Sequence, residues 1–133
     1  MRLLLLFSAL ILAAPLAAQP AAREPEWRQS ADFDVLLEPF DIQPGEIRLE
    51  ANRPVRLRFV NSGQRSLGFS APGFFRAARI RSGDGDDLQD GSFRLEAGER
   101  RTIVLVPRAG RYGMRGINVF HRLMGMKGRI VVE

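Results

Sequence analysis

The sequence predicts an antiparallel β-sandwich, and three observations support this fold class. Short segments in which apolar and polar residues alternate recur along the chain, as expected for strands that bury one face. Turn-forming sequences rich in glycine and proline separate these segments. The sequence shows no helical segments long enough to connect parallel strands. With 133 residues, the chain is long enough for one domain with its own core.

The predicted elements follow from these patterns in order. Alternation is clearest in 46–51 and 54–61, where every second residue is apolar, which places Val55, Leu57 and Phe59 on one buried face. The sequences AGE and PRAG are good turns and divide 91–116 into three strands. We therefore expect strands at 33–40 (ended by Pro39), 46–51 and 54–61, three within 91–116 and one at 126–133, with a short helix in 72–80.

The N-terminal segment is typical of a secretory signal peptide. Arg2 precedes an apolar run from Leu3 to Ala14, and Pro15 and small residues follow. The alternative, an uncleaved membrane anchor, is less favoured because the run is shorter than the roughly 20 residues that a span needs. We therefore expect a signal peptide at 1–18, a Pro-rich lead-in at 19–32 and a domain at 33–133, exported to the periplasm or secreted.

Export with cleavage after Ala18 gives a mature chain that begins at Gln19. Intact-mass spectrometry of the exported protein checks this expectation. Recovery of exported protein that still carries residues 1–18 would contradict it.

Composition excludes several chemistries. The chain has no cysteine, so it has no disulfides, no thiolate metal ligand and no thiol nucleophile. A single histidine gives little support to a catalytic triad, and we expect no enzymatic activity. The net charge is +5, and no nucleic-acid-binding motif accompanies it. Five basic residues between 111 and 129 form either a solvated face or a contact for an anionic surface: Arg111, Arg115, Arg122, Lys127 and Arg129.

The stretch 113–130 concentrates soft metal-ligand types. It contains the only histidine, His121, and three of the four methionines, Met114, Met124 and Met126. Imidazole and thioether groups suit copper, and reduced copper in particular. The stretch is therefore the first candidate for a metal site.

Several segments, taken in order, resemble the cupredoxin family. They are IRLEANRPVRLRFVNSG, LGFSAPGFF, GSFRLEAGERRTIVLVPRAGRYGMRG and HRLMGMKGRIVVE, and together they cover roughly 33–133. The resemblance implies a Greek-key sandwich of about seven to eight strands with one short helix. It also implies a copper site of two His, one Cys and one Met. His121 and Met126 match two of these positions, whereas Leu67 and Gly116 stand at the other two.

The two lost positions exclude a blue-copper electron-transfer centre, which needs a thiolate and two imidazoles. Three alternatives stay open. In the first, the site is repacked as core, with Met114 filling part of the gap at Gly116. In the second, His121 and Met126, with Met124 as a candidate third ligand, hold Cu(I) more tightly than Cu(II), and binding weakens at low pH. In the third, another chain completes a copper site.

The acidic loop 82–91 is a weaker candidate site. Its carboxylates could bind Ca²⁺, but the spacing places Leu88 and Gln89 where a calcium loop needs a ligand and a glycine. A solvated turn accounts for it better. We therefore expect an exported, non-enzymatic binding module, with copper or a periplasmic protein as its partner. A metal-free structural or interaction domain is the alternative.

Overall fold

The structure is a computed structural model, and it describes residues 23–133. These residues form ten strands, two α-helices and one 3-10 helix. In chain order the elements are η1 (Trp27–Gln29), β1 (Ala31–Glu38), β2 (Asp41–Gln43), β3 (Glu46–Leu49), β4 (Val55–Asn61), β5 (Leu67–Ser70), α1 (Pro72–Ala77), β6 (Arg79–Ile80), β7 (Ser92–Leu95), β8 (Arg100–Val106), β9 (Gly110–Gly116), α2 (Val119–Leu123) and β10 (Lys127–Val132).

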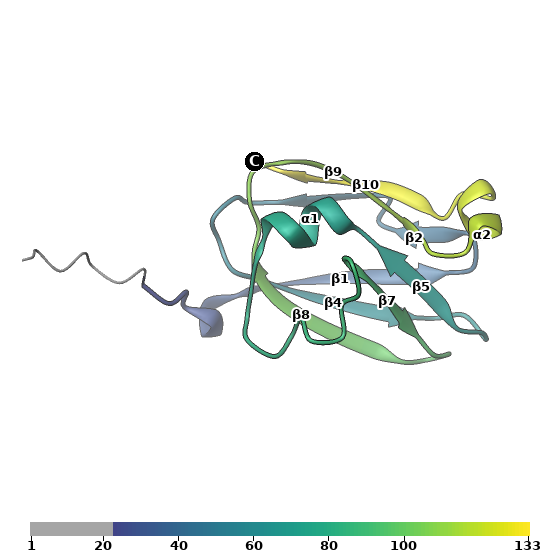
Figure 1. The fold of residues 1–133 in the computed structure, drawn as a ribbon, viewed down its shortest axis with the longest axis horizontal. Helices are drawn as coiled ribbons and strands as arrows, with labels where there is room; N and C mark the ends of the chain where they lie inside the picture. Colours follow the sequence, from purple (N-terminus) through teal and green to yellow (C-terminus); the bar gives the residue numbers. More distant parts are fainter. Residues whose placement is uncertain (1–22) are drawn as a thin grey trace, which may run out of the picture.

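Two five-stranded sheets form a sandwich (Figure 1). One sheet has the order β2-β1-β4-β8-β6, and the other has the order β3-β10-β9-β5-β7. Most neighbouring strands are antiparallel, but β1 pairs with β4 and β3 with β10 in parallel. The predicted β-sandwich is thus confirmed, with these two parallel pairs as an addition to the expected antiparallel pattern.

The elements that the sequence pattern missed are short or lack a period. β2 and β6 have three and two residues, too few to show alternation. All four residues of β5 are buried, so this strand lacks the alternation of buried and exposed positions that marks a half-buried strand. The second helix, α2, has only five residues. Residues 23–133 thus form two α-helices and ten strands, where the sequence predicted one helix and seven to eight strands.

Side chains from both sheets form the core between them. Val55, Leu57 and Phe59 are buried, as the alternation in β4 predicted. The Phe59 ring lies against the rings of Phe69 at 4.9 Å and Phe93 at 5.0 Å, which joins the two sheets.

The outer face of β4 is polar. Arg58 is exposed, and its Nη2 donates to Asp34 Oδ2 on β1 at 3.0 Å. This hydrogen bond raises the pKa of the Arg58 guanidinium. Burial of one face of β4 and exposure of the other confirm the predicted register of this strand.

The predicted signal peptide at 1–18 lies outside the described residues. Within the predicted lead-in, η1 covers 27–29 and β1 begins at Ala31, two residues before the expected domain start. Glu24 holds the segment to the sandwich through an ion pair with Arg79 at 2.9 Å. None of the helices between residues 23 and 133 is long and apolar enough to span a bilayer.

Asp84 is the residue of the acidic loop 82–91 that makes the shortest contacts to the sandwich. Asp84 Oδ2 accepts a hydrogen bond from the backbone N–H of Val104 at 2.7 Å and lies 3.1 Å from Arg81 Nη2. Asp86, Asp87 and Asp90 are exposed. Nowhere in residues 23–133 do three or more His, Asp or Glu side chains gather into a group that could hold a metal ion.

Candidate functional site

The candidate site lies at one end of the sandwich, where the chain leaves β9, forms α2 and returns in β10 (Figure 1). Asn118 caps α2, because its side-chain oxygen accepts the N–H of Phe120 at 2.8 Å. Gly125 then adopts the left-handed backbone conformation (φ 118°) that ends the turn. The N–H of Met126 donates to the carbonyl of His121 at 2.8 Å. This hydrogen bond closes the loop and fixes where it rejoins the sheet.

Gly116 and Met126, which stand at two of the four positions where the resemblance implies copper ligands, lie in direct contact. The N–H of Gly116 donates to the carbonyl of Met126 at 2.8 Å. A Cβ atom added to Gly116 would lie 2.5 Å from the sulfur of Met126 and 3.1 Å from its Cγ. The Met126 side chain is fully buried. Its sulfur therefore fills the space beside Gly116.

This contact changes one detail of the sequence interpretation. Met114 was expected to fill part of the gap at Gly116, since both residues face the core from β9. Met114 is indeed buried, but its Cε lies beside Gly128, where an added Cβ would meet it at 2.6 Å. The side chain that fills the gap at Gly116 is that of Met126.

Leu67 occupies the second lost position. It lies on β5, the strand next to β9, where Phe69 pairs with Gly116. Leu67 and Phe69 are two residues apart, so both face the core, and both are buried. The following Gly68 admits Ile117, because an added Cβ there would lie 2.5 Å from Ile117 Cδ1. An aliphatic core side chain thus stands where the resemblance implies a first imidazole.

The remaining predicted ligands are not brought into one buried cluster. His121 is half-buried on α2, and its ring meets the ring of Phe40 edge-on at 5.2 Å. Met124, at the end of α2, is 58% exposed. Only Met126 points into the core. The residues at this site therefore do not fit a blue-copper centre. Such a centre needs an imidazole and a thiolate where this chain has Leu67 and Gly116, and the Met126 sulfur fills the space beside Gly116.

Comparison with known proteins identifies the fold. No protein-family model and no curated protein matches the sequence. Among solved structures, the reduced auracyanin of Roseiflexus castenholzii is 15% identical, with a TM-score of 0.57 over 78% of this chain and 98% of that one. Auracyanin A, a blue copper protein of Chloroflexus aurantiacus, is 14% identical, with a TM-score of 0.55 over 78% and 99%. The fold is cupredoxin-like.

A larger protein shares the same cupredoxin-like fold. The multicopper oxidase of Campylobacter jejuni is 9% identical, with a TM-score of 0.58 over 94% of this chain but 34% of that one. At these identities the likeness concerns the fold alone. It confirms the cupredoxin-like fold that the resemblance of 33–133 implies, and it leaves the function of the chain to its own residues.

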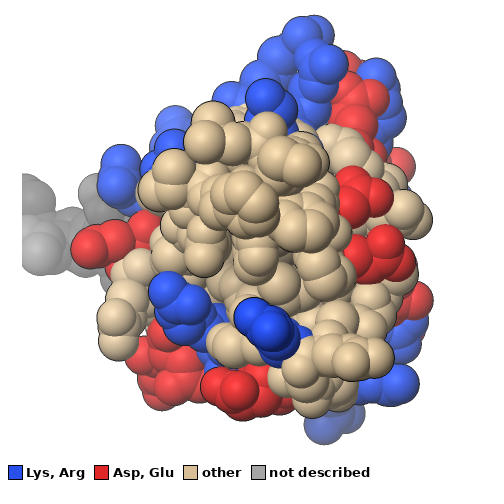
Figure 2. Space-filling model, turned by 90° about the vertical axis from the view of Figure 1, so that its right-hand side faces the viewer, with Lys and Arg blue, Asp and Glu red and all other residues tan. Residues whose placement is uncertain are grey.

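An apolar patch surrounds His121 at the surface. It consists of Phe40, Val119, Phe120, Leu123 and Met124, which are 39%, 58%, 59%, 79% and 58% exposed. These are the exposed large hydrophobic side chains of residues 23–133. Figure 2 shows this end of the molecule as a broad surface free of charged side chains, with charges around its margin. The sequence interpretation missed this apolar patch, although the apolar residues of the run NVFHRLM fall on one face of a helical turn, opposite His121 and Arg122.

Phe40 joins this apolar patch through an unusual backbone. Its φ is 68°, a left-handed conformation that is rare for a bulky residue. The Phe40 ring meets the ring of Phe120 edge-on at 5.7 Å. Its carbonyl oxygen packs against Gly125, where an added Cβ would come within 3.0 Å. Such conformations persist where the surroundings hold them, and they are frequent at functional surfaces.

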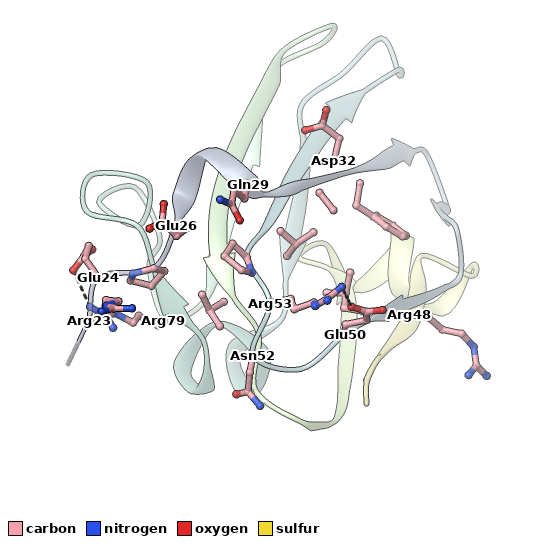
Figure 3. A pocket seen from close by; sticks show the side chains of 17 residues that line it. Arg23, Glu24, Glu26, Gln29, Asp32, Arg48, Glu50, Asn52, Arg53 and Arg79 are labelled. Carbon is pink, nitrogen blue, oxygen red and sulfur yellow. Dashed lines mark hydrogen bonds and ion pairs between the residues drawn. The ribbon is translucent and has the colours of Figure 1, made fainter.

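A groove of 810 Å³ lies elsewhere, between the N-terminal segment and the loop after β3 (Figure 3). Its charges are of both signs and partly paired with one another: Arg53 lies 2.8 Å from Glu50, and Arg79 lies 2.9 Å from Glu24. No predicted ligand lines this groove. The α2 end remains the candidate functional site.

Proposed function

We propose that this chain is an exported, non-enzymatic binding module on a cupredoxin-like scaffold, and that it works without an electron-transfer copper centre. Its binding surface is the apolar patch over the former copper position. The single observation that carries the proposal is the contact between the Met126 sulfur and Gly116. It supports a site repacked as core, the first of the three alternatives raised by the sequence.

Energetics favour this interpretation. A buried methionine that fills a gap contributes dispersion contacts and removes apolar surface from water, so opening the space again for a ligand has a free-energy cost. The exposed apolar side chains of α2, in contrast, remain largely in water and so contribute little burial energy to the fold. Five exposed large hydrophobic residues at one end are the usual mark of an interaction surface.

The copper-loaded protein should show no intense blue thiolate charge-transfer band. The reason is composition and geometry together: the chain has no thiolate, and the space beside Gly116 is filled. Visible absorption after addition of Cu(II) to the purified mature chain checks this, with auracyanin as the positive control. An intense blue band in the pure monomer would contradict the proposal.

A second candidate function is Cu(I) binding for delivery or storage. The observation that favours it is the closed loop, in which the Met126 N–H donates to the His121 carbonyl at 2.8 Å and thereby keeps an imidazole and a thioether in one short segment. Met124 is free to turn toward His121 because it is exposed. Such a site requires the Met126 side chain to leave the core beside Gly116.

A further inference from the structure

We propose that the apolar patch docks on a lipid bilayer that carries anionic phospholipids. This inference rests on the proposed function and names the partner of the same surface. It draws on three features of the α2 end: the shape of the apolar patch, the cations beside it and the strained residue that supports it.

The apolar patch is a projection rather than a hollow. α2 stands out at the end of the sandwich (Figure 1), and Leu123 at its last turn is 79% exposed. Two grooves of the described part of the chain lie elsewhere, and neither is lined by a residue of α2. A projecting tip of Val, Phe, Leu and Met side chains suits insertion into the boundary between headgroups and acyl chains.

Unpaired cations stand next to the tip. Arg122 belongs to α2 itself, and Lys127 and Arg115 face each other across the β9–β10 pair that carries the loop. None of the three forms an ion pair with a described residue, unlike Arg129, which lies 3.4 Å from Glu46. Phosphate groups of anionic lipids are the complementary partner, and long basic side chains reach them while the apolar residues insert.

Two carboxylates flank Phe40, and one of them already accepts hydrogen bonds within the hairpin. Glu38 and Asp41 flank Phe40 on the β1–β2 hairpin. Asp41 already accepts hydrogen bonds from the Ile42 N–H at 2.9 Å and from Gln43 Nε2 at 3.0 Å. Three cations, Arg115, Arg122 and Lys127, thus stand beside α2 against the two carboxylates that flank Phe40, which favours an anionic bilayer over a zwitterionic one.

Phe40 adds the third feature. Its left-handed backbone directs the ring onto Phe120 and His121 instead of into the core. Pro39 and Phe40 form the two-residue loop of the β1–β2 hairpin, where the turn requires a positive φ at Phe40. An aromatic residue rather than glycine at this position adds to the exposed apolar surface. It enlarges the surface that a bilayer would cover.

The test is vesicle flotation with the mature chain, Gln19–Glu133. Vesicles of phosphatidylglycerol mixed with phosphatidylcholine should carry the protein at low salt, and pure phosphatidylcholine vesicles should carry far less. Leu123→Asp should weaken binding by about tenfold or more, because it places a charge at the inserted tip. The triple variant Arg115→Gln, Arg122→Gln, Lys127→Gln should weaken it by roughly 100-fold.

A matched control separates docking from general charge attraction. Arg28, Arg76 and Arg108 are exposed, lack ion pairs with described residues and lie away from α2, so their triple change to Gln removes the same net charge. This control should change binding by no more than about threefold, since distant charges are screened. Equal losses in the two triple variants would overturn the proposal, because binding would then follow net charge alone.

A spectroscopic readout tests insertion directly. The chain has one tryptophan, Trp27, in η1 at the other end. In a Trp27→Phe background, Phe120→Trp should shift its emission to the blue when phosphatidylglycerol vesicles are added, because the indole enters a less polar region. No vesicle binding by the wild-type chain would overturn the lipid proposal. Self-association that Leu123→Asp abolishes would then indicate a second copy as the occupant, and copper titration would still test the proposed function separately.

Discussion

Replacing Phe59 with alanine should lower the free energy of unfolding by about 3–5 kcal/mol, the range for deep truncations of a core aromatic. Phe59 is 1% exposed, and its ring contacts Phe69 at 4.9 Å and Phe93 at 5.0 Å. Removing it leaves a cavity at the point where the two sheets meet. Equilibrium urea denaturation of the mature chain measures the loss.

Arg58→Ala is the matched control, one residue away on the other face of β4. Arg58 pairs with Asp34 and Asp32, but all three side chains are largely exposed, so the expected cost is only about 0.5 kcal/mol. A larger loss for Arg58→Ala than for Phe59→Ala would mean that the register of β4 is shifted by one residue.

Gly116→Ala should destabilise the fold by about 1–3 kcal/mol, because the new methyl group must displace a packed side chain. The added Cβ would lie 2.5 Å from the Met126 sulfur. Met126→Ala alone should cost about 2–5 kcal/mol through the cavity that it leaves. The double variant should cost less than the sum of the two single changes, by roughly 0.5–3 kcal/mol. The new methyl group at position 116 then enters the cavity that Met126→Ala leaves, so it displaces no side chain.

Gly113→Ala is the control for this pair of changes. Gly113 lies on the same strand, is exposed and has no neighbour within 4 Å of an added Cβ. Its change should stay within about 0.5 kcal/mol. Strict additivity of Gly116→Ala and Met126→Ala would show that the sulfur does not fill the space beside Gly116.

The same geometry bears on rebuilding a copper centre with Leu67→His and Gly116→Cys. Gly116 is not among the residues with positive φ, so its backbone accepts a cysteine. The obstacle is the Met126 side chain, which has to move before a thiolate and a metal fit. Conversion therefore depends on displacing one flexible side chain rather than on altering the strand.

Much of this fold was predictable because its strands alternate. Val55, Leu57 and Phe59 mark β4 by period alone, and the turn sequences AGE and PRAG mark the ends of β8. β5 was not predictable in this way, because all of its residues from Leu67 to Ser70 are buried. The parallel pairing of β1 with β4 joins segments that lie far apart in the sequence, which a local pattern does not record.

The candidate site was only partly predictable. Composition sufficed to exclude a thiolate centre, and the resemblance located Leu67 and Gly116. Which methionine fills the gap depends on side-chain packing, and two residues of the same type, Met114 and Met126, were equally suitable by chemistry. The apolar patch was hidden because Phe40 lies about 80 residues from α2 and joins it through a left-handed backbone that sequence does not mark.

The most direct test of the central claim is a Cu(I) competition titration against a chromogenic chelator. It compares the mature wild-type chain with His121→Ala, Met124→Leu and Met126→Leu, and uses Met114→Leu as the control for a buried methionine away from Gly116. If the former copper position is closed core, all five proteins should bind Cu(I) equally weakly. Tight binding by wild type that His121→Ala and Met126→Leu abolish and Met114→Leu preserves would contradict the account and establish the His/Met copper site instead.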